Sequence, residues 1–237
     1  MDAMVKTEVR VWDWPTRAFH WLLVSAILCA WLSAEFGRKL GDSMLVWHKW
    51  NGYIILVLIV FRLIWGFAGS STARFSHFVH GPAFVLRYAM DFARGHKRAF
   101  LGHNPLGTLM VLALMAVVTF QAISGLFSFE PDNFIAGPLA RLLEDDTATG
   151  VLKWHYRGFT LIQLLVLAHV TANILYGVLA KDPLIRAMAK GTKPAKVYED
   201  EMEAVIPANV TLRAALAFAA ALVIVFGGIV LAGGRLF

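Results

Sequence analysis

The run from 153 to 180 reads KWHYRGFTLIQLLVLAHVTANILYGVLA and carries two histidines, His155 and His169, in one long apolar segment. A helix rises 1.5 Å per residue, so the separation of fourteen residues corresponds to about 21 Å along its axis. Fourteen steps of about 100° return to nearly the same face, about 40° short of full registry. Ionisable side chains inside a membrane are costly and rare, which makes both histidines functional candidates. The run therefore predicts a membrane helix that presents imidazole rings at two depths.

The composition places the rest of the chain in a membrane as well. Of 237 residues, 58% are hydrophobic and only 16% are charged, with a mean hydropathy of +0.62, whereas soluble domains carry about a quarter charged residues. The single cysteine, Cys29, excludes an internal disulfide, a cysteine-based zinc site and a cysteine-ligated iron–sulfur cluster. The polar start, MDAMVKTEVRVWDWP, predicts no cleavable signal peptide. Apolar segments that approach or exceed the roughly 20 residues of a membrane span are 17–36, 46–68, 105–128, 153–180 and 210–233.

Basic residues in the connections predict the orientation, because they concentrate on the cytoplasmic side of membrane proteins. The connection 69–104 carries five basic residues against one acid, whereas 129–152 carries one base against five acids. The segment before the first span and the stretch after 180 are also basic. We therefore expect a cytoplasmic N-terminus and, after five spans, an outer C-terminus. The segment 76–94 mixes aromatic and basic residues, which predicts an interfacial helix.

Two further histidines, His20 and His48, lie near the starts of the first and second spans. With the predicted orientation, His20 is level with His169 on the cytoplasmic side, and His48 is level with His155 on the outer side. Two imidazoles facing each other from separate helices are the ligand set of a bis-histidine haem. Zinc or copper would need three or four ligands converging on one point, which two pairs about 21 Å apart do not supply. The alternative, four hydrogen-bonded interior histidines without a ligand, explains the matched depths less well.

Several other residues are candidates for haem contacts. Arg62 is fourteen residues from His48 and so level with the cytoplasmic pair, where it would pair with a haem propionate. His103, in GHNPLG, is a candidate for a propionate or quinone contact. Glycines near the histidines allow a flat macrocycle to approach the backbone, although close helix packing predicts the same glycines. For the terminal bases the alternative to a propionate contact is snorkelling to the interface; these bases are Arg17 on the cytoplasmic side and Lys49, Lys153 and Arg157 on the outer side.

In combination, several motifs between residues 9 and 195 resemble the bacterial cytochrome b561 and nickel–iron hydrogenase b-type cytochrome family. These motifs are VWDWPTRAFHWLL, WHKWNGY, FRLIWG, GHNPLG, and WHYRG followed by LAHV. The resemblance implies an all-α membrane protein, in which a four-helix transmembrane bundle holds two b haems through His20, His48, His155 and His169. It also implies electron transfer across the bacterial cytoplasmic (inner) membrane between a quinone, ubiquinone or menaquinone, and a redox partner on the periplasmic side.

The sequence departs from the short four-helix members in its acidic outer loop, its tail 196–209 and its fifth span. We therefore expect a di-haem domain over 1–195, followed by a cytoplasmic tail and an additional C-terminal transmembrane helix over 196–237.

Two versions of the function stay open. In one, the chain is the membrane anchor of a complex and exchanges electrons with a hydrogenase, a dehydrogenase or a c-type cytochrome. In the other, it works alone as a superoxide:quinone oxidoreductase. The acidic run Glu144-Asp145-Asp146 favours a basic protein partner over a small anion, although an ordinary solvated loop explains it equally well. A non-redox transporter or structural subunit is the alternative of another class. It would need polar residues clustered at mid-membrane. The predicted spans offer only a few there, Thr119, Gln121 and Ser124 in the third span, so little supports this alternative.

Overall fold

The computed structural model describes residues 7–40, 43–96, 98–133 and 135–236, and the side chains of 37–40, 43–44 and 133 lie outside that description. Two of the basic residues counted for the orientation, Lys6 and Lys97, therefore lie outside it.

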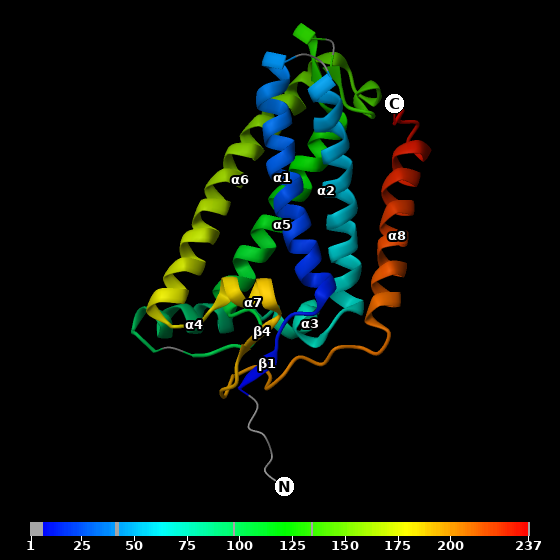
Figure 1. Cartoon of the computed structure of the whole chain (residues 1–237). Helices are drawn as coiled ribbons and strands as arrows, with labels where there is room; N and C mark the ends of the chain where they lie inside the picture. Colours follow the sequence, from blue (N-terminus) through cyan, green and yellow to red (C-terminus); the bar gives the residue numbers. More distant parts are fainter. Residues whose placement is uncertain (1–6, 41–42, 97, 134, 237) are drawn as a thin grey trace. The chain divides into compact units, whose positions relative to one another are not determined.

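In the described residues, five helices are long and apolar enough to cross a membrane, as predicted. A bilayer offers no water to backbone N–H and C=O groups, so a spanning segment satisfies them within its own helix. The chain is thus an all-α, multi-pass membrane protein (Figure 1). The five helices are α1 (Trp14–Leu40), α2 (Ser43–Ala68), α5 (Pro105–Phe127), α6 (Asp145–Leu179) and α8 (Val210–Leu231).

Two helical segments differ from their predicted limits. Helix α6 begins at Asp145, eight residues before the predicted span at 153. Asp145 and Asp146 lie in its first turn, where negative charge is favourable at the positive end of the helix dipole. The predicted interfacial helix 76–94 is two helices, α3 (Phe75–Phe78) and α4 (Pro82–Ala93). Proline at the start of α4 fits the first helical turn and keeps the preceding Gly81 extended, which separates the two.

The remaining elements are short. Helix α7 spans Leu184–Lys190, and three 3₁₀ turns lie at Ser71–Ala73, Pro131–Asn133 and Ala140–Leu142. Strand β1 (Glu8–Arg10) pairs antiparallel with β4 (Thr192–Pro194), with Val9 opposite Lys193 (Figure 1). Strand β2 (Phe129–Glu130) pairs antiparallel with β3 (Ile135–Ala136).

The chain divides into two compact units, and each long helix begins in one and ends in the other. Unit 1 is built from residues 1–18, 65–113 and 166–214. Unit 2 is built from residues 19–64, 114–165 and 215–237.

Asp13 is the central polar residue of unit 1. Its carboxylate is only 1% exposed and accepts the backbone N–H of Thr16 at 2.8 Å, which caps the start of α1. The same carboxylate accepts the indole N–H of Trp65 at 3.1 Å and the backbone N–H of Ser70 at 3.1 Å, both from the end of α2. One side chain therefore joins the start of α1 to the end of α2.

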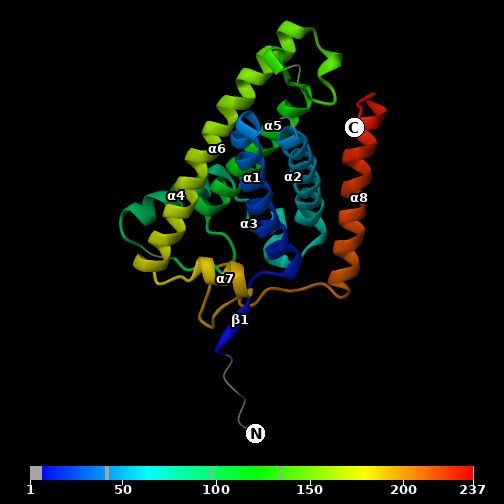
Figure 2. The ribbon, with the colours of Figure 1, turned by 45° about the horizontal axis from the view of Figure 1, so that its top comes forward.

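Helix α8 packs against α2 within unit 2 (Figures 1 and 2). The ring centroids of Tyr53 and Phe226 lie 5.9 Å apart, and those of Phe61 and Phe218 lie 6.3 Å apart. Small residues on α8, among them Ala217 and Ala221, are buried, which lets the helices approach closely. The fifth span is thus part of this chain's own helix packing.

We predict that Asp13→Ala lowers the free energy of unfolding by about 3 kcal/mol, because it removes a helix cap and leaves buried N–H donors without an acceptor. A thermal melt of the purified protein in detergent measures the change. Asp132→Ala, which removes an exposed acid, is the matched control and should melt like the wild type. Equal melting of the two variants would contradict the role given to Asp13.

Candidate functional site

His48 of α2 and His155 of α6 face each other in unit 2, as their predicted depths required. Their ring centroids are 6.1 Å apart and their planes are nearly perpendicular, at 84°. Both side chains are half-buried. The two imidazoles therefore lie close enough to share one ligand.

A hydrogen bond fixes the orientation of the His48 ring. Its Nδ1 lies 2.8 Å from the backbone carbonyl oxygen of Ala30 in α1. A carbonyl only accepts, so Nδ1 carries the proton and donates. The Nε2 atom of His48 is then left with a free lone pair, which is the form that ligates a metal.

Ser124 of α5 performs the same task for His155. The hydroxyl of Ser124 donates to the carbonyl oxygen of Gln121 at 3.0 Å, and its oxygen lies 3.1 Å from Nδ1 of His155. Because the hydroxyl proton is already used, the oxygen accepts from Nδ1–H. His155 thus also presents Nε2. The sequence pointed to Ser124 only as a mid-membrane polar residue; its place beside His155 depends on how α5 packs on α6.

The glycines around these histidines differ in what surrounds them. A Cβ at Gly125 would lie 3.0 Å from Cε1 of His155, so this glycine makes room for the ring. A Cβ at Gly52, one turn after His48, would meet nothing within 4 Å. At Gly158 a Cβ would lie 2.5 Å from the side-chain oxygen of Gln121, which is a helix-packing contact. Gly52 therefore borders open space, whereas Gly158 serves close packing.

The second predicted pair is divided between the two units. His20 lies in unit 2, half-buried, with its ring edge-on to Trp21 at 4.9 Å. His169 lies in unit 1, where the side-chain amide of Asn173 is 3.3 Å from its Nε2. The pairing of His20 with His169 stays a prediction from their positions along the helices.

The other predicted contacts lie in varied surroundings. Arg62 is buried in α2, at 3% exposure. Arg17 donates to the carbonyl oxygen of Ala189 at 2.8 Å, near the end of α7. Arg157 lies 4.9 Å over the ring of Trp154, in a cation–π contact of two exposed residues that fits the snorkelling alternative.

His103 occupies an aromatic setting in unit 1. Its ring centroid is 4.8 Å from that of Trp12 and 4.8 Å from that of Phe78. It does not line the pocket described next, although its neighbours Gly102 and Asn104 do.

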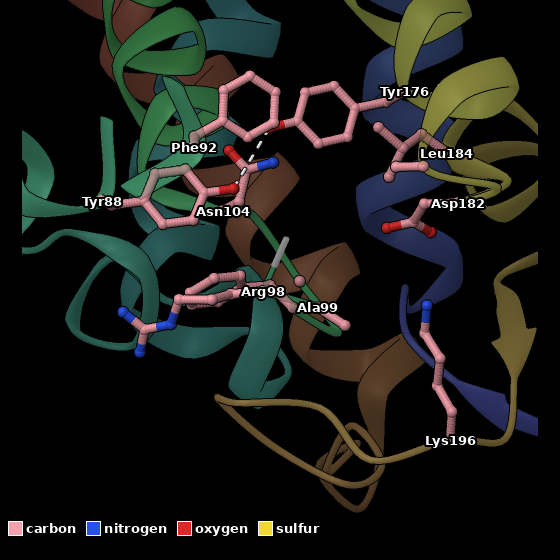
Figure 3. A pocket seen from close by; sticks show the side chains of 12 residues that line it. Tyr88, Phe92, Arg98, Ala99, Asn104, Tyr176, Asp182, Leu184 and Lys196 are labelled. Atoms are coloured by element: carbon pink, nitrogen blue, oxygen red, sulfur yellow. Dashed lines mark hydrogen bonds between the residues drawn. The ribbon is translucent and has the colours of Figure 1, made fainter. Parts of the chain in front are cut away.

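Unit 1 contains a pocket of about 220 Å³, which we call the Tyr88–Tyr176 pocket (Figure 3). The hydroxyl oxygens of Tyr88 and Tyr176 are 3.3 Å apart, and the rings of Phe92 and Tyr176 stack at 5.5 Å. Asn104 also lines the pocket (Figure 3). The other lining residues are Arg98, Ala99, Phe100, Gly102, Ala180, Asp182, Leu184 and Lys196.

A buried ion pair supports one wall of this pocket. The Nζ atom of Lys193 is 3.0 Å from the Asp182 carboxylate and donates to the carbonyl oxygen of Phe100 at 3.1 Å. Burial lowers the pKa of Lys193, while Asp182 opposes that effect by favouring the ammonium form. Sequence reasoning missed the pocket, because its residues come from α4, the connection before α5, α6, α7 and the tail.

Comparison with known proteins finds a matching family and several similar sequences. Residues 11–191 match the family described as prokaryotic cytochrome b561. A probable Ni/Fe-hydrogenase 1 B-type cytochrome subunit from Escherichia coli (strain K12) is 24% identical over 214 residues, covering 78% of this chain and 91% of the relative. Probable Ni/Fe-hydrogenase B-type cytochrome subunits from Azotobacter vinelandii and Rhizobium leguminosarum bv. viciae are 23% and 21% identical, covering 81% and 84% of this chain and 90% and 94% of the relatives.

The His48–His155 geometry fits the haem that a b-type cytochrome holds. Two imidazoles that bind one metal ion are separated by two metal–nitrogen bonds of about 2 Å and by the distance from each nitrogen to the centre of its ring. Together these distances give roughly 6 Å between the ring centroids. The observed separation is 6.1 Å. Both rings present Nε2, and Gly52, one turn after His48, borders open space.

We predict that Ser124→Ala raises the midpoint potential of the haem that His155 would hold. Loss of the Nδ1–H acceptor makes the imidazole a weaker electron donor, which disfavours oxidised iron. A hydrogen bond of about 1 kcal/mol corresponds to a shift on the order of 40 mV for one electron. A spectroscopic redox titration measures it. Thr119→Ala, which also removes a helix hydroxyl bonded to a backbone carbonyl, is the control and should leave that potential unchanged.

Proposed function

Because the chain belongs to the prokaryotic cytochrome b561 family and is a membrane b-type cytochrome of electron transfer, we propose that it holds two haems b and links the quinone pool to a redox partner. The observation that carries this proposal is the facing of His48 and His155 with both Nε2 atoms available.

His48 and His155 would be the axial ligands of the outer haem. The carbonyl of Ala30 and the hydroxyl of Ser124 hold their rings in the ligating tautomer, so little rearrangement is needed to bind iron. Haem b, when bound, supplies a one-electron carrier whose potential depends on its axial ligands and their hydrogen bonds.

His20 and His169 would be the ligands of the cytoplasmic haem. His169 follows His155 by about 21 Å along α6, so one helix supplies a ligand to each haem. Arg62, buried in α2 fourteen residues after His48, is the proposed propionate partner at the cytoplasmic level.

The outer partner is proposed from charge and from the relatives. Glu144, Asp145 and Asp146 are exposed in unit 2, at and just before the start of α6. A negative surface steers a basic partner toward it. The names of the relatives point to a hydrogenase as the redox partner. A dehydrogenase or a c-type cytochrome is the alternative redox partner. The proposed orientation is an N-terminus in the cytoplasm and a C-terminus in the periplasm, in the inner membrane.

The Tyr88–Tyr176 pocket is the proposed site for the quinone head group. Its stacked aromatic rings suit a flat ring, and its hydroxyl and amide groups suit the two oxygens of a quinone. The basic connections that predict the cytoplasmic side also contribute Arg98 and Lys196 to the lining.

Two alternatives are less well supported. A stand-alone superoxide:quinone oxidoreductase would receive its anion past the exposed acidic run, where like charge slows encounter. A transporter would need broken helices or polar residues clustered at mid-membrane, and of Thr119, Gln121 and Ser124 only Gln121 has a buried side-chain oxygen without a hydrogen-bond partner. The hydroxyls of Thr119 and Ser124 instead bond to carbonyls of their own helix, and Ser124 also serves His155.

We predict two haems b per chain, seen as b-type bands in the reduced-minus-oxidised spectrum and counted by haem extraction. His155→Ala and His169→Ala should each remove one haem and leave the other, because each variant deletes one axial ligand. His80→Gln, outside the proposed ligand set, should retain both haems. A single haem in the wild type, or an unchanged count in His155→Ala, would overturn the assignment.

We predict that Tyr88→Phe and Tyr176→Phe each raise the KM for a quinol about tenfold, since each removes one hydrogen bond of about 1 to 1.5 kcal/mol. Steady-state haem reduction by quinol measures it, with dithionite reduction unchanged. The control is Tyr156→Phe, an exposed tyrosine of α6 in unit 2. Unchanged KM values in both pocket variants would exclude this pocket while leaving the haem assignment intact.

A further inference from the structure

An acidic segment of the tail, Tyr198–Val205, binds three separate parts of unit 1; we call it the acidic strap. The backbone N–H of Glu199 donates to the carbonyl oxygen of Ala99 at 2.9 Å. The backbone N–H of Ala204 donates to the carbonyl oxygen of Arg10 at 2.9 Å. The backbone N–H of Ser71 donates to the carbonyl oxygen of Val205 at 3.0 Å. The strap thus joins β1, the start of the 69–104 connection and the segment before α5.

Each acid of the strap also has a partner on one of these segments. Glu199 pairs with Arg98 at 2.9 Å, and Glu203 pairs with Arg10 at 3.1 Å. Asp200 accepts the backbone N–H groups of Leu101 at 2.6 Å and Gly102 at 2.9 Å. Glu201 accepts the hydroxyl of Ser71 at 2.6 Å.

Among the described residues that pair with the strap, His77 is the one whose charge changes near neutral pH, because arginine stays protonated. Its Nε2 lies 3.4 Å from Asp200 and 3.9 Å from Glu201. The His77 and Asp200 side chains are 19% and 9% exposed, so solvent screens this pair less than the Arg10–Glu203 pair, at 60% and 28%. Arg74 is the neighbouring cation and opposes protonation of His77.

We propose that His77 and the acidic strap form a pH-sensitive latch on the wall of the Tyr88–Tyr176 pocket. Asp200 holds the backbone of Leu101 and Gly102, while Gly102, Arg98 and Lys196 line the pocket. When His77 is protonated the latch is closed, and when it is neutral the strap loses its least exposed ion pair and opens more often. The latch operates whether or not the pocket takes a quinone.

The direction of the pH effect follows from the two partners. Asp200 holds the pKa of His77 above its ordinary value, mainly through their direct contact, although burial opposes this. Burial opposes ionisation of Asp200, but its contact with His77 and its hydrogen bonds from the backbone N–H groups of Leu101 and Gly102 hold its pKa below the ordinary value. The charged pair therefore exists between the lowered pKa of Asp200 and the raised pKa of His77. Its contribution is lost as the pH rises through the pKa of His77.

Cysteine labelling of the full-length protein tests the latch. In a Cys29→Ser background, which removes the only native cysteine, Ala204→Cys places a thiol at a buried strap position. Val197→Cys places one at an exposed position just before the strap; Ala204 is 2% and Val197 is 81% exposed. The labelling rate of the thiol at 204 is divided by that of the thiol at 197. This ratio cancels the intrinsic pH dependence of the reaction between a thiol and maleimide. We expect this ratio to rise about fivefold between about pH 5.5 and pH 8.5.

Two histidine variants make the test specific. His77→Gln should give a high ratio that no longer depends on pH, whereas His80→Gln, whose ring stacks on Phe84, should behave like the parent. Hydrogen exchange at Leu101 and Gly102 in the chain without cysteine substitutions, corrected for intrinsic rates, should report the same opening if Ala204→Cys fails to fold. A flat response in the parent, or a pH response that persists in His77→Gln, would overturn the latch.

Discussion

The absence of water inside a bilayer is the constraint on which the whole structure depends. Because backbone N–H and C=O groups find no other partners there, the chain crosses as α1, α2, α5, α6 and α8. Because a helix rises 1.5 Å per residue, the position of a residue along a spanning helix determines its depth in the membrane. A polar ring in a span then needs a hydrogen-bond partner from the packed helices. Ala30 and Ser124 supply those partners for His48 and His155.

This constraint explains why so much could be predicted from the sequence. The five spans follow from apolar length alone, and the level of His48 with His155 follows from counting along helices; their rings do face each other. Depth does not specify which side chain of a third helix lies beside a ring, so Ser124 was not recognised as the partner of His155. The pairing of His20 with His169 rests on the same counting and awaits its own test.

Outside the spans, polar residues act through contacts distant in sequence, which no periodicity reveals. Asp13 joins the start of α1 to Trp65 and Ser70, and Tyr88 meets Tyr176 although 88 residues separate them. The sequence alone predicted the segment 196–209 only as a cytoplasmic tail before the fifth span. In the structure its acids pair one by one with groups from three segments, an order that depends entirely on tertiary packing.

The fifth helix gives the acidic strap its reversibility. The strap is bounded by β4, which pairs with β1, and by α8, whose Phe218 and Phe226 contact rings of α2 in unit 2. A segment anchored at both ends loses little chain entropy when it closes again, because its ends are already held. Release of the strap is therefore a local opening, of the kind that occurs far below the free energy of global unfolding. A single half-buried histidine is sufficient to bias such an opening, whereas it would be too weak to move a membrane-spanning helix.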